Sequence, residues 1–145
     1  MIGVAVRQDA SKALRALDGL SSAMRGYAVS GIVREIATGT FKQAFENLSG
    51  DRTAPKGSWP VPVRIGHLRR SLWALLPGGE KAGGGISGKY GVGFSEAYVG
   101  DSAEYAEKIH EERPFLYAAL DDQMSKAPGI ARAFMDKEVR LRGLD

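Results

Sequence analysis

A long amphipathic pattern constrains the fold of this chain more than any other feature of its sequence. From about residue 11 to Leu48, apolar side chains recur at intervals of three and four residues, which places them on one face of an α-helix. They are Leu14, Leu17, Met24, Tyr27, Ala28, Ile32, Ile36, Phe41, Phe45 and Leu48. Asp9 and Ser11 lie where the start of a helix needs acceptors for its free amides. We therefore predict one long N-terminal helix in a chain of 145 residues, a length that suits a single domain over residues 1–145.

Glycine interrupts this helical pattern and is concentrated again later in the chain. The pattern contains Gly19, Gly26, Gly31 and Gly39. Each costs the helix about 1 kcal/mol relative to alanine, so we expect a bend or break between Gly26 and Gly31. Glycines on the packed face would also let another backbone approach closely. Nine of the 19 glycines lie between Gly78 and Gly100, and they predict a flexible loop over residues 78–88.

Three short segments have the patterns of β-strands. Ile2, Val4 and Val6 alternate with small residues and predict a strand before the long helix. Three prolines then make residues 51–66 an extended connector. The apolar run from Leu68 to Leu76 predicts a helical turn that leads into a second strand. Alternation over residues 90–98 predicts a third, paired with the second as a glycine-rich hairpin.

The last third of the chain carries the start and stop signals of helices. Asp101 or Ser102 is expected to cap a short helix through His110, and Pro114 to begin the next helix. That helix should turn inward Phe115, Leu116, Ala119, Leu120 and Met124. After an interruption at Pro128 and Gly129, a last helix should turn inward Ile130, Phe134 and Leu141, and fray over residues 140–145. This order of elements predicts an α+β fold with a small antiparallel sheet.

Composition limits the core and excludes several classes of site. Leu, Ile, Val and Phe make up 33 residues, so many buried positions must be alanine or glycine, and we expect help from neighbouring subunits. The absence of cysteine excludes disulfides, thiolate metal sites and a cysteine nucleophile. We expect no membrane span and no secretory signal, and hence a protein that acts or assembles in a cytoplasm.

Charge is distributed unevenly along the sequence. Residues 51–93 contain seven basic and two acidic side chains, whereas residues 101–145 contain seven basic and ten acidic ones. The basic segment could attract nucleic acid, or the middle of one copy could meet the acidic end of the next.

No motif in the sequence assembles a catalytic or cofactor site. Gly83–Lys89 fits G-x-x-x-x-G-K, but Tyr90 replaces the magnesium-binding Ser or Thr and a strand is expected to follow, which favours a mobile loop. His67 and His110 lack the spacing of metal ligands. We interpret Glu104, Glu107, Glu111 and Glu112 as an acidic stripe that faces solvent or a partner. Ser71, Ser87 and Ser95 lack the context of a nucleophile. We therefore expect no enzyme, cofactor, metal or small-molecule substrate.

A basic cluster beside an aromatic leaves two interpretations open. His67, Arg69 and Arg70 precede Trp73, a combination that can contact phosphate and stack on a base. Alternatively, the arginines form ion pairs with an acidic helix of the same chain or of a neighbouring one.

Three segments share their order and spacing with a known family. The first holds G-x-L-R-x-S-[IL] at Gly66, Leu68, Arg69, Ser71 and Leu72. The second holds V-G and then Y-A-x-x-[VI]-x-E at Val99, Gly100, Tyr105, Ala106, Ile109 and Glu111. The third is R-P-F-L at Arg113–Leu116. Over most of residues 10–125, the chain thus resembles the tail-completion, or head-to-tail joining, proteins of long-tailed bacteriophages. It departs from them at Ile65, where threonine is common, and in the single residue between Glu111 and Arg113, where a longer loop is common.

This resemblance implies a structural protein of the virion, assembled in the cytoplasm of a bacterial host. It implies a ring, six-fold in that family, at the neck between tail and head. The partners would be a connector or head-completion protein and the tail tube or a tail terminator protein, with DNA close by in the channel. Candidate interface residues are Arg69, Arg70, Glu107, His110, Glu111 and Arg113, with Glu112 as a further partner for the arginines. We expect Leu68, Tyr105 and Phe115 to serve the core, and the 78–88 loop to order on contact with a neighbour.

Overall fold

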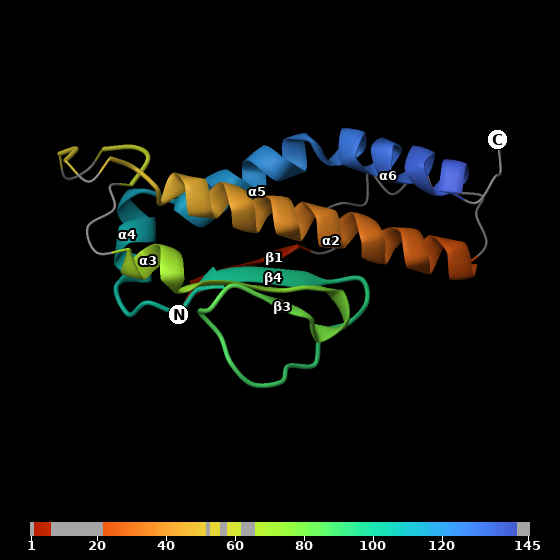
Figure 1. Cartoon of the computed structure of the whole chain (residues 1–145), viewed down its shortest axis with the longest axis horizontal. Helices are drawn as coiled ribbons and strands as arrows, with labels where there is room; N and C mark the ends of the chain where they lie inside the picture. The colour runs from red at the N-terminus through yellow and green to blue at the C-terminus, as the bar shows by residue number, and fades with distance from the viewer. Residues whose placement is uncertain (1, 7–21, 52, 56–57, 62–65, 142–145) are drawn as a thin grey trace.

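A long helix lies between a small sheet and a pair of C-terminal helices in the computed structural model of the chain (Figure 1). The structure describes residues 2–6, 22–51, 53–55, 58–61 and 66–141. Its elements are β1 (Ile2–Val6), α2 (Ser22–Asn47), α3 (His67–Arg70), β2 (Leu72–Leu75), η3 (Pro77–Gly79), β3 (Lys81–Ala82), β4 (Ala97–Asp101), α4 (Ala106–Glu112), α5 (Phe115–Ser125) and α6 (Ala127–Leu141). The α+β class, the long helix and the antiparallel sheet are confirmed.

The four strands form one antiparallel sheet in the order β1-β4-β2-β3. Val99 in β4 lies opposite Val4 on one side and Ala74 on the other, so β4 is central. The strand predicted over residues 90–98 begins only at Ala97, and β3 pairs with β2 inside the predicted loop. Residues 90–96 form no strand because they fold back locally: the Gly93 amide donates to the Glu96 carboxylate at 3.0 Å.

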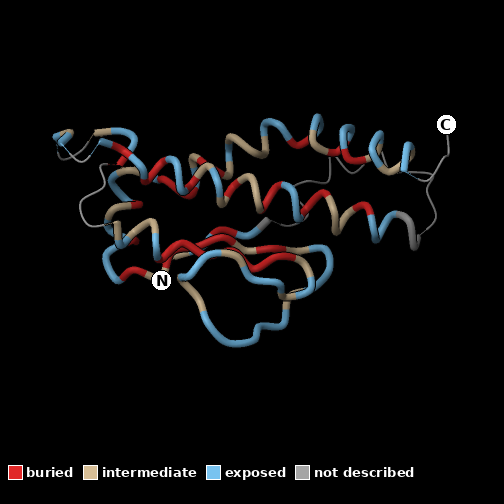
Figure 2. Tube along the Cα trace, in the orientation of Figure 1, coloured by how far each residue is buried: buried red, intermediate tan, exposed pale blue. Residues whose placement is uncertain are grey.

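One face of the sheet and the inner faces of the helices make the core (Figure 2). The largest fully buried side chains include Ile32 and Ile36 of α2, Leu72 of β2, and Phe115 and Leu116 of α5. Alanine supplies ten of the 24 buried apolar residues that the structure describes, in line with the small side chains expected from composition. Such positions add little apolar area to the core.

Helix α2 is one continuous helix from Ser22 to Asn47, so the bend expected between Gly26 and Gly31 is wrong. Packing of other helices explains how the helix tolerates its glycines. A Cβ added at Gly31 would lie 2.2 Å from Cζ of Phe134 in α6, and one added at Gly39 would lie 2.1 Å from Oε1 of Gln123 in α5. We predicted that glycine would let another backbone approach this helix closely; at Gly31 and Gly39 the close approach is made by side chains instead. Asp9, Ser11 and Gly19 lie outside the described residues.

The C-terminal helices follow the predicted order with three differences. Helix α4 begins after Tyr105, so neither Asp101 nor Ser102 caps it as predicted. The carboxylate of Asp101 instead accepts the amide of Ala103 at 2.9 Å. The break between α5 and α6 falls at Lys126, whereas Pro128 lies in the first turn of α6, where a missing amide is tolerated. Leu141 was expected inside but is 71% exposed, because the described core contacts of α6 end before it, at Met135.

Helices α2 and α6 are the longest of the part that the structure describes, and no described helix has the length and hydropathy of a membrane span.

Candidate protein interface

The three segments that carry the sequence resemblance meet at one end of the molecule, on the left in Figure 1. The Ser102 amide donates to the Ser71 carbonyl at 3.0 Å, which ties the end of β4 to the end of α3. The ring centroids of His67 in α3 and Tyr105 lie 5.8 Å apart. Helix α3, helix α4 and the start of α5 through Tyr117 thus form one surface, called here the α3–α4 end.

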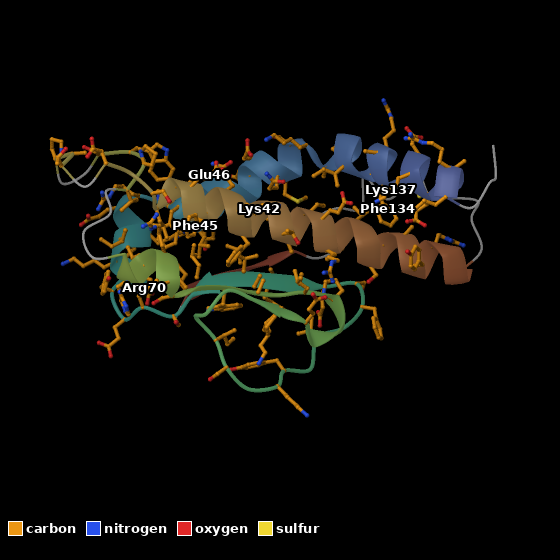
Figure 3. All side chains as sticks on the ribbon, in the orientation of Figure 1. Lys42, Phe45, Glu46, Arg70, Phe134 and Lys137 are labelled. Atoms are coloured by element: carbon orange, nitrogen blue, oxygen red, sulfur yellow. The ribbon has the colours of Figure 1, made fainter. Side chains whose placement is uncertain are left out.

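Two arginines of α3 contribute positive charge to this end, in different ways. Arg69 is half-buried; its guanidinium lies 5.2 Å from the centroid of the Phe45 ring, and its Nη1 lies 3.4 Å from Oγ of Ser49. Arg70 is exposed, and Figure 3 shows it at the edge of α3. Arg70 is also close enough to Tyr105 for its charge to influence the pKa of that phenol. The sequence missed Phe45 as the partner of Arg69.

Helix α4 contributes the negative charge. Glu107, Glu111 and Glu112 are exposed, as is Glu104 just before the helix. Within the described ranges of the chain, none of these glutamates forms an ion pair with Arg69, Arg70 or Arg113. The expected pairing inside one subunit is therefore not formed, and charges of both signs lie side by side.

His110 lies beneath this surface instead of on it. It is 4% exposed, and its ring meets those of Phe115 and Tyr117 edge-on, with centroids 5.3 and 4.4 Å away. Its Nε2 accepts the Tyr117 amide at 3.2 Å, and burial lowers the pKa of the imidazole. His110 therefore fixes the turn between α4 and α5 as a neutral side chain.

Arg113 is also largely internal. Its Nη1 donates to the carbonyl of Ser58 at 3.4 Å, while its Nε is buried with no hydrogen-bond partner among the described residues. This contact places the segment around Trp59 against the turn between α4 and α5. Arg113 thus positions a neighbouring segment, in contrast to the exposed Arg70.

Three exposed aromatic side chains come from segments that meet at or next to this end. Tyr105, Tyr117 and Trp59 are 42%, 53% and 49% exposed, whereas Phe115 is fully buried. Tyr105 was expected in the core, and Leu68 lies against the core in a half-buried position. Tyr117 could have been identified from helical periodicity, because it lies two residues from Phe115 and so on the opposite face of α5. Tyrosine, tryptophan and arginine are the residues most enriched at protein interfaces.

A buried carboxyl supports the α3–α4 end from below. Asp101 is fully buried; its Oδ1 accepts the Ala103 amide, and its Oδ2 has no partner among the described residues. Burial raises the pKa of Asp101 to about 6. Burial and the charge of Asp101 also raise the pKa of the Tyr105 hydroxyl. This carboxyl holds the turn that leads into α4.

The aromatic residue of the predicted basic cluster is not available to a base. Trp73 is 6% exposed and lies across the face of the sheet away from α2, where a Cβ added at Gly100 would lie 2.3 Å from its Cζ2. The stacking role proposed for Trp73 is therefore wrong. The sequence could not predict this packing, because Gly3 and Gly100 are 97 positions apart and become neighbours only through strand pairing.

The glycine-rich loop folds onto its own sheet. The Gly85 amide donates to the Leu72 carbonyl at 3.1 Å, and the Lys81 ammonium donates to the Gly88 carbonyl. Residues 86–96 continue without helix, so the loop has none of the helix N-terminal amides that would face a phosphate.

An open groove of about 630 Å³ lies along α2. Its lining includes Tyr27, Arg34 and Lys42 of α2, Phe134 of α6 and Pro77 of η3. The Arg34 guanidinium forms an ion pair with Glu80 beside it. The described residues contain no group of three or more histidines, aspartates or glutamates that could hold a metal ion.

Comparisons of the chain with family models, with curated proteins and with solved structures find no match.

Proposed function

We propose that this chain is a structural subunit of a phage-type virion that joins the tail to the head, as a member of a ring of identical copies. The observation that carries the proposal is the convergence of three segments, far apart in sequence, at the α3–α4 end. These are the segments that resemble the head-to-tail joining proteins. They combine there into a surface of exposed aromatic and charged side chains.

The chemistry of this surface supports a role in binding protein. Arg70, Glu107 and Glu111 are exposed beside Tyr105 and Tyr117. Aromatic side chains provide large contact areas, and charges of both signs select the orientation of a partner. In the virion, the partners would be neighbouring copies, a connector or head-completion protein, and the tail tube or tail terminator protein.

Deletion of the gene in the strain that encodes the chain tests the joining role. We expect electron micrographs of induced cells to show filled heads and complete tails as separate objects. Expression of the wild-type chain from a plasmid should restore joined particles. Normal yields of joined particles after the deletion would contradict the proposal.

The alternative is a nucleic-acid-binding module that uses the basic segment 51–93. Fluorescence anisotropy with a labelled 20-base-pair duplex separates the two functions. We expect weak binding that disappears at about 150 mM salt, because the described cations of this segment lie on separate elements: Arg69 and Arg70 on α3, Lys81 in β3 and Lys89 in the loop that follows it. Tight binding at that salt concentration would favour the alternative.

A further inference from the structure

The two ends of the molecule carry helices of opposite charge. At one end, Glu104 and α4 together expose four glutamates and one lysine. At the other end, α6 exposes Arg132, Lys137 and Arg140 against a single exposed aspartate, Asp136. Figure 1 shows α4 at the left end, and α6 running to the right end. Although residues 101–145 carry more acidic than basic side chains, their exposed charges are therefore mainly negative on α4 and mainly positive on α6.

Each of these helices also has large apolar side chains beside its charges. Tyr105 and Tyr117 are exposed next to α4. Leu141, the last residue of α6, is 71% exposed, and Tyr27 is 54% exposed with its ring centroid 6.3 Å from that of Phe134 in α6. Figure 3 shows Phe134 and Lys137 on the same helix. Helix α4 with Glu104 and helix α6 therefore each combine neighbouring apolar side chains with charges mainly of one sign, although the exposed Arg70 of α3 lies beside the acidic helix.

The spacing of the charges allows the two helices to pair. Glu107 and Glu111 are four residues apart, and Lys137 and Arg140 are three apart, so each pair spans about one helical turn and projects from one side. Two glutamates four residues apart repel each other within α4, and a cationic helix placed against them would relieve that repulsion. Within the described part of the chain, none of these four side chains forms an ion pair.

We propose that copies of this chain associate head to tail, with α4, Tyr105 and Tyr117 of one copy on α6, Tyr27 and Leu141 of the next. The inference deepens the proposed function and rests on it, since it names the contact that would build the ring. The two surfaces differ and lie at opposite ends, so every copy uses both of them. A repeated contact of this kind closes into a ring when its rotation divides a full turn.

A contact of standard size would cover a small part of the surface of the chain. A standard interface buries about 800 Å² on each partner. The chain exposes 8461 Å², so each contact would cover about a tenth of its surface. A contact rich in unlike charges should also weaken as salt is added, because ions screen exposed charges over about 10 Å at 0.1 M.

Two charge-reversed variants test the pairing. The first, Glu107→Lys with Glu111→Lys, makes α4 basic; the second, Lys137→Glu with Arg140→Glu, makes α6 acidic. We expect light scattering to give the mass of a single chain for each variant alone, under conditions where the wild type associates. An equimolar mixture should associate again, because each reversed helix then meets an unlike helix on the other variant.

A matched control reverses two exposed charges elsewhere, in Glu35→Lys with Asp121→Lys, and should associate as the wild type does. Circular dichroism melting curves of all variants check that each one folds.

Three results would overturn the inference. The first is failure of the mixture to associate when the wild type does. The second is normal association of the α6 variant together with loss of association in the α4 variant and in Arg70→Glu, which would indicate a two-fold contact between α3 and α4. The third is a wild-type chain that stays monomeric at every concentration. In each case separate heads and tails in the gene deletion would leave the joining role standing.

Discussion

At the scale of single residues, two glycines have opposite consequences for stability. A Cβ added at Gly100 would lie 2.3 Å from Cζ2 of Trp73 and 2.4 Å from the carbonyl oxygen of Ile2. We expect Gly100→Ala to lower the free energy of unfolding by about 2 kcal/mol, as overpacking does. At Gly26 an added Cβ meets nothing within 4 Å, so Gly26→Ala should raise it by about 0.5 to 1 kcal/mol. Urea denaturation measures both, and changes of the same sign would contradict the packing described.

The buried carboxyl of Asp101 makes stability depend on pH. Its pKa is about 6 in the folded chain and about 3.9 in an unfolded one, so the folded state holds the proton more tightly. This group therefore makes the free energy of unfolding fall as pH rises from about 4 to about 6. Asp101→Asn keeps an acceptor for the Ala103 amide and cannot ionise. We expect the variant to be more stable than the wild type at pH 7, by about 2 kcal/mol, and about equal to it at pH 4.

His110 acts in the opposite direction and must be measured beside Asp101. Burial lowers its pKa, and its Nε2 must stay unprotonated to accept the Tyr117 amide. This group therefore makes the free energy of unfolding fall as pH drops below about 6.5. Because the two groups act in opposite directions, we expect His110→Gln to shift the change in the free energy of unfolding between pH 7 and 5 towards greater stability at pH 5, as followed by thermal melting. The same change in the variant and in the wild type would contradict a neutral, buried His110.

The sequence predicted the burial of some single side chains correctly and of others wrongly. Phe115 was correctly expected in the core, but Tyr105 was expected there too and is exposed. One of the two interpretations of the basic cluster placed Trp73 at the surface, where it could stack on a base, but Trp73 is buried over glycines of two other strands. These environments depend on strand register, which brings Trp73 opposite Gly100 and is not encoded in any local pattern.

At the scale of elements, one amide joins the long helix to the C-terminal helices. Asn47 is 5% exposed, and its Nδ2 donates to the carbonyl of Phe115 at 3.1 Å. The backbone carbonyl of Asn47 accepts the Val61 amide at 2.7 Å. We expect Asn47→Ala to lower the free energy of unfolding by about 1 to 2 kcal/mol, because the bond between α2 and α5 is lost in a buried place.

Thr38→Ala is the matched control for Asn47. The Thr38 hydroxyl donates to the Arg34 carbonyl at 2.8 Å, inside α2 and exposed to solvent. Its removal should change the free energy of unfolding by no more than about 0.5 kcal/mol. Equal effects of the two substitutions in chemical denaturation would contradict the role given to Asn47.

Elements with long periodic patterns were predicted well, and short glycine-rich ones were not. The period of the apolar residues predicted α2, α5 and α6, and alternation predicted β1. Residues 90–94 alternate as a strand would, yet they form a loop because Gly78 and Glu96 hold Gly93 through its carbonyl and amide. No local sequence pattern predicts the two-residue strand β3. Such segments are decided by tertiary contacts, which outweigh local preference.

At the scale of the whole molecule, the fold rearranges the charges of the sequence. The basic middle and the acidic C-terminal third are distinct along the chain, yet α3 and α4 lie side by side. The charges that remain separated in space are those of α4 and α6, two helices that both belong to the acidic segment 101–145. Sequence alone could not show this, because it depends on the opposite ends to which the fold brings the two helices (Figure 1).

Cross-linking between copies tests the head-to-tail contact most directly. The chain contains no cysteine, so thiols introduced by mutation are the only ones present. Lys108→Cys on α4 and Ala133→Cys on α6 place thiols at exposed positions and keep every glutamate and cation assigned to the contact. With a short bis-maleimide, we predict a ladder of covalent oligomers from the double variant and single chains from each single variant. Dimers from Lys108→Cys alone, or no ladder from a double variant that associates in solution, would contradict the account.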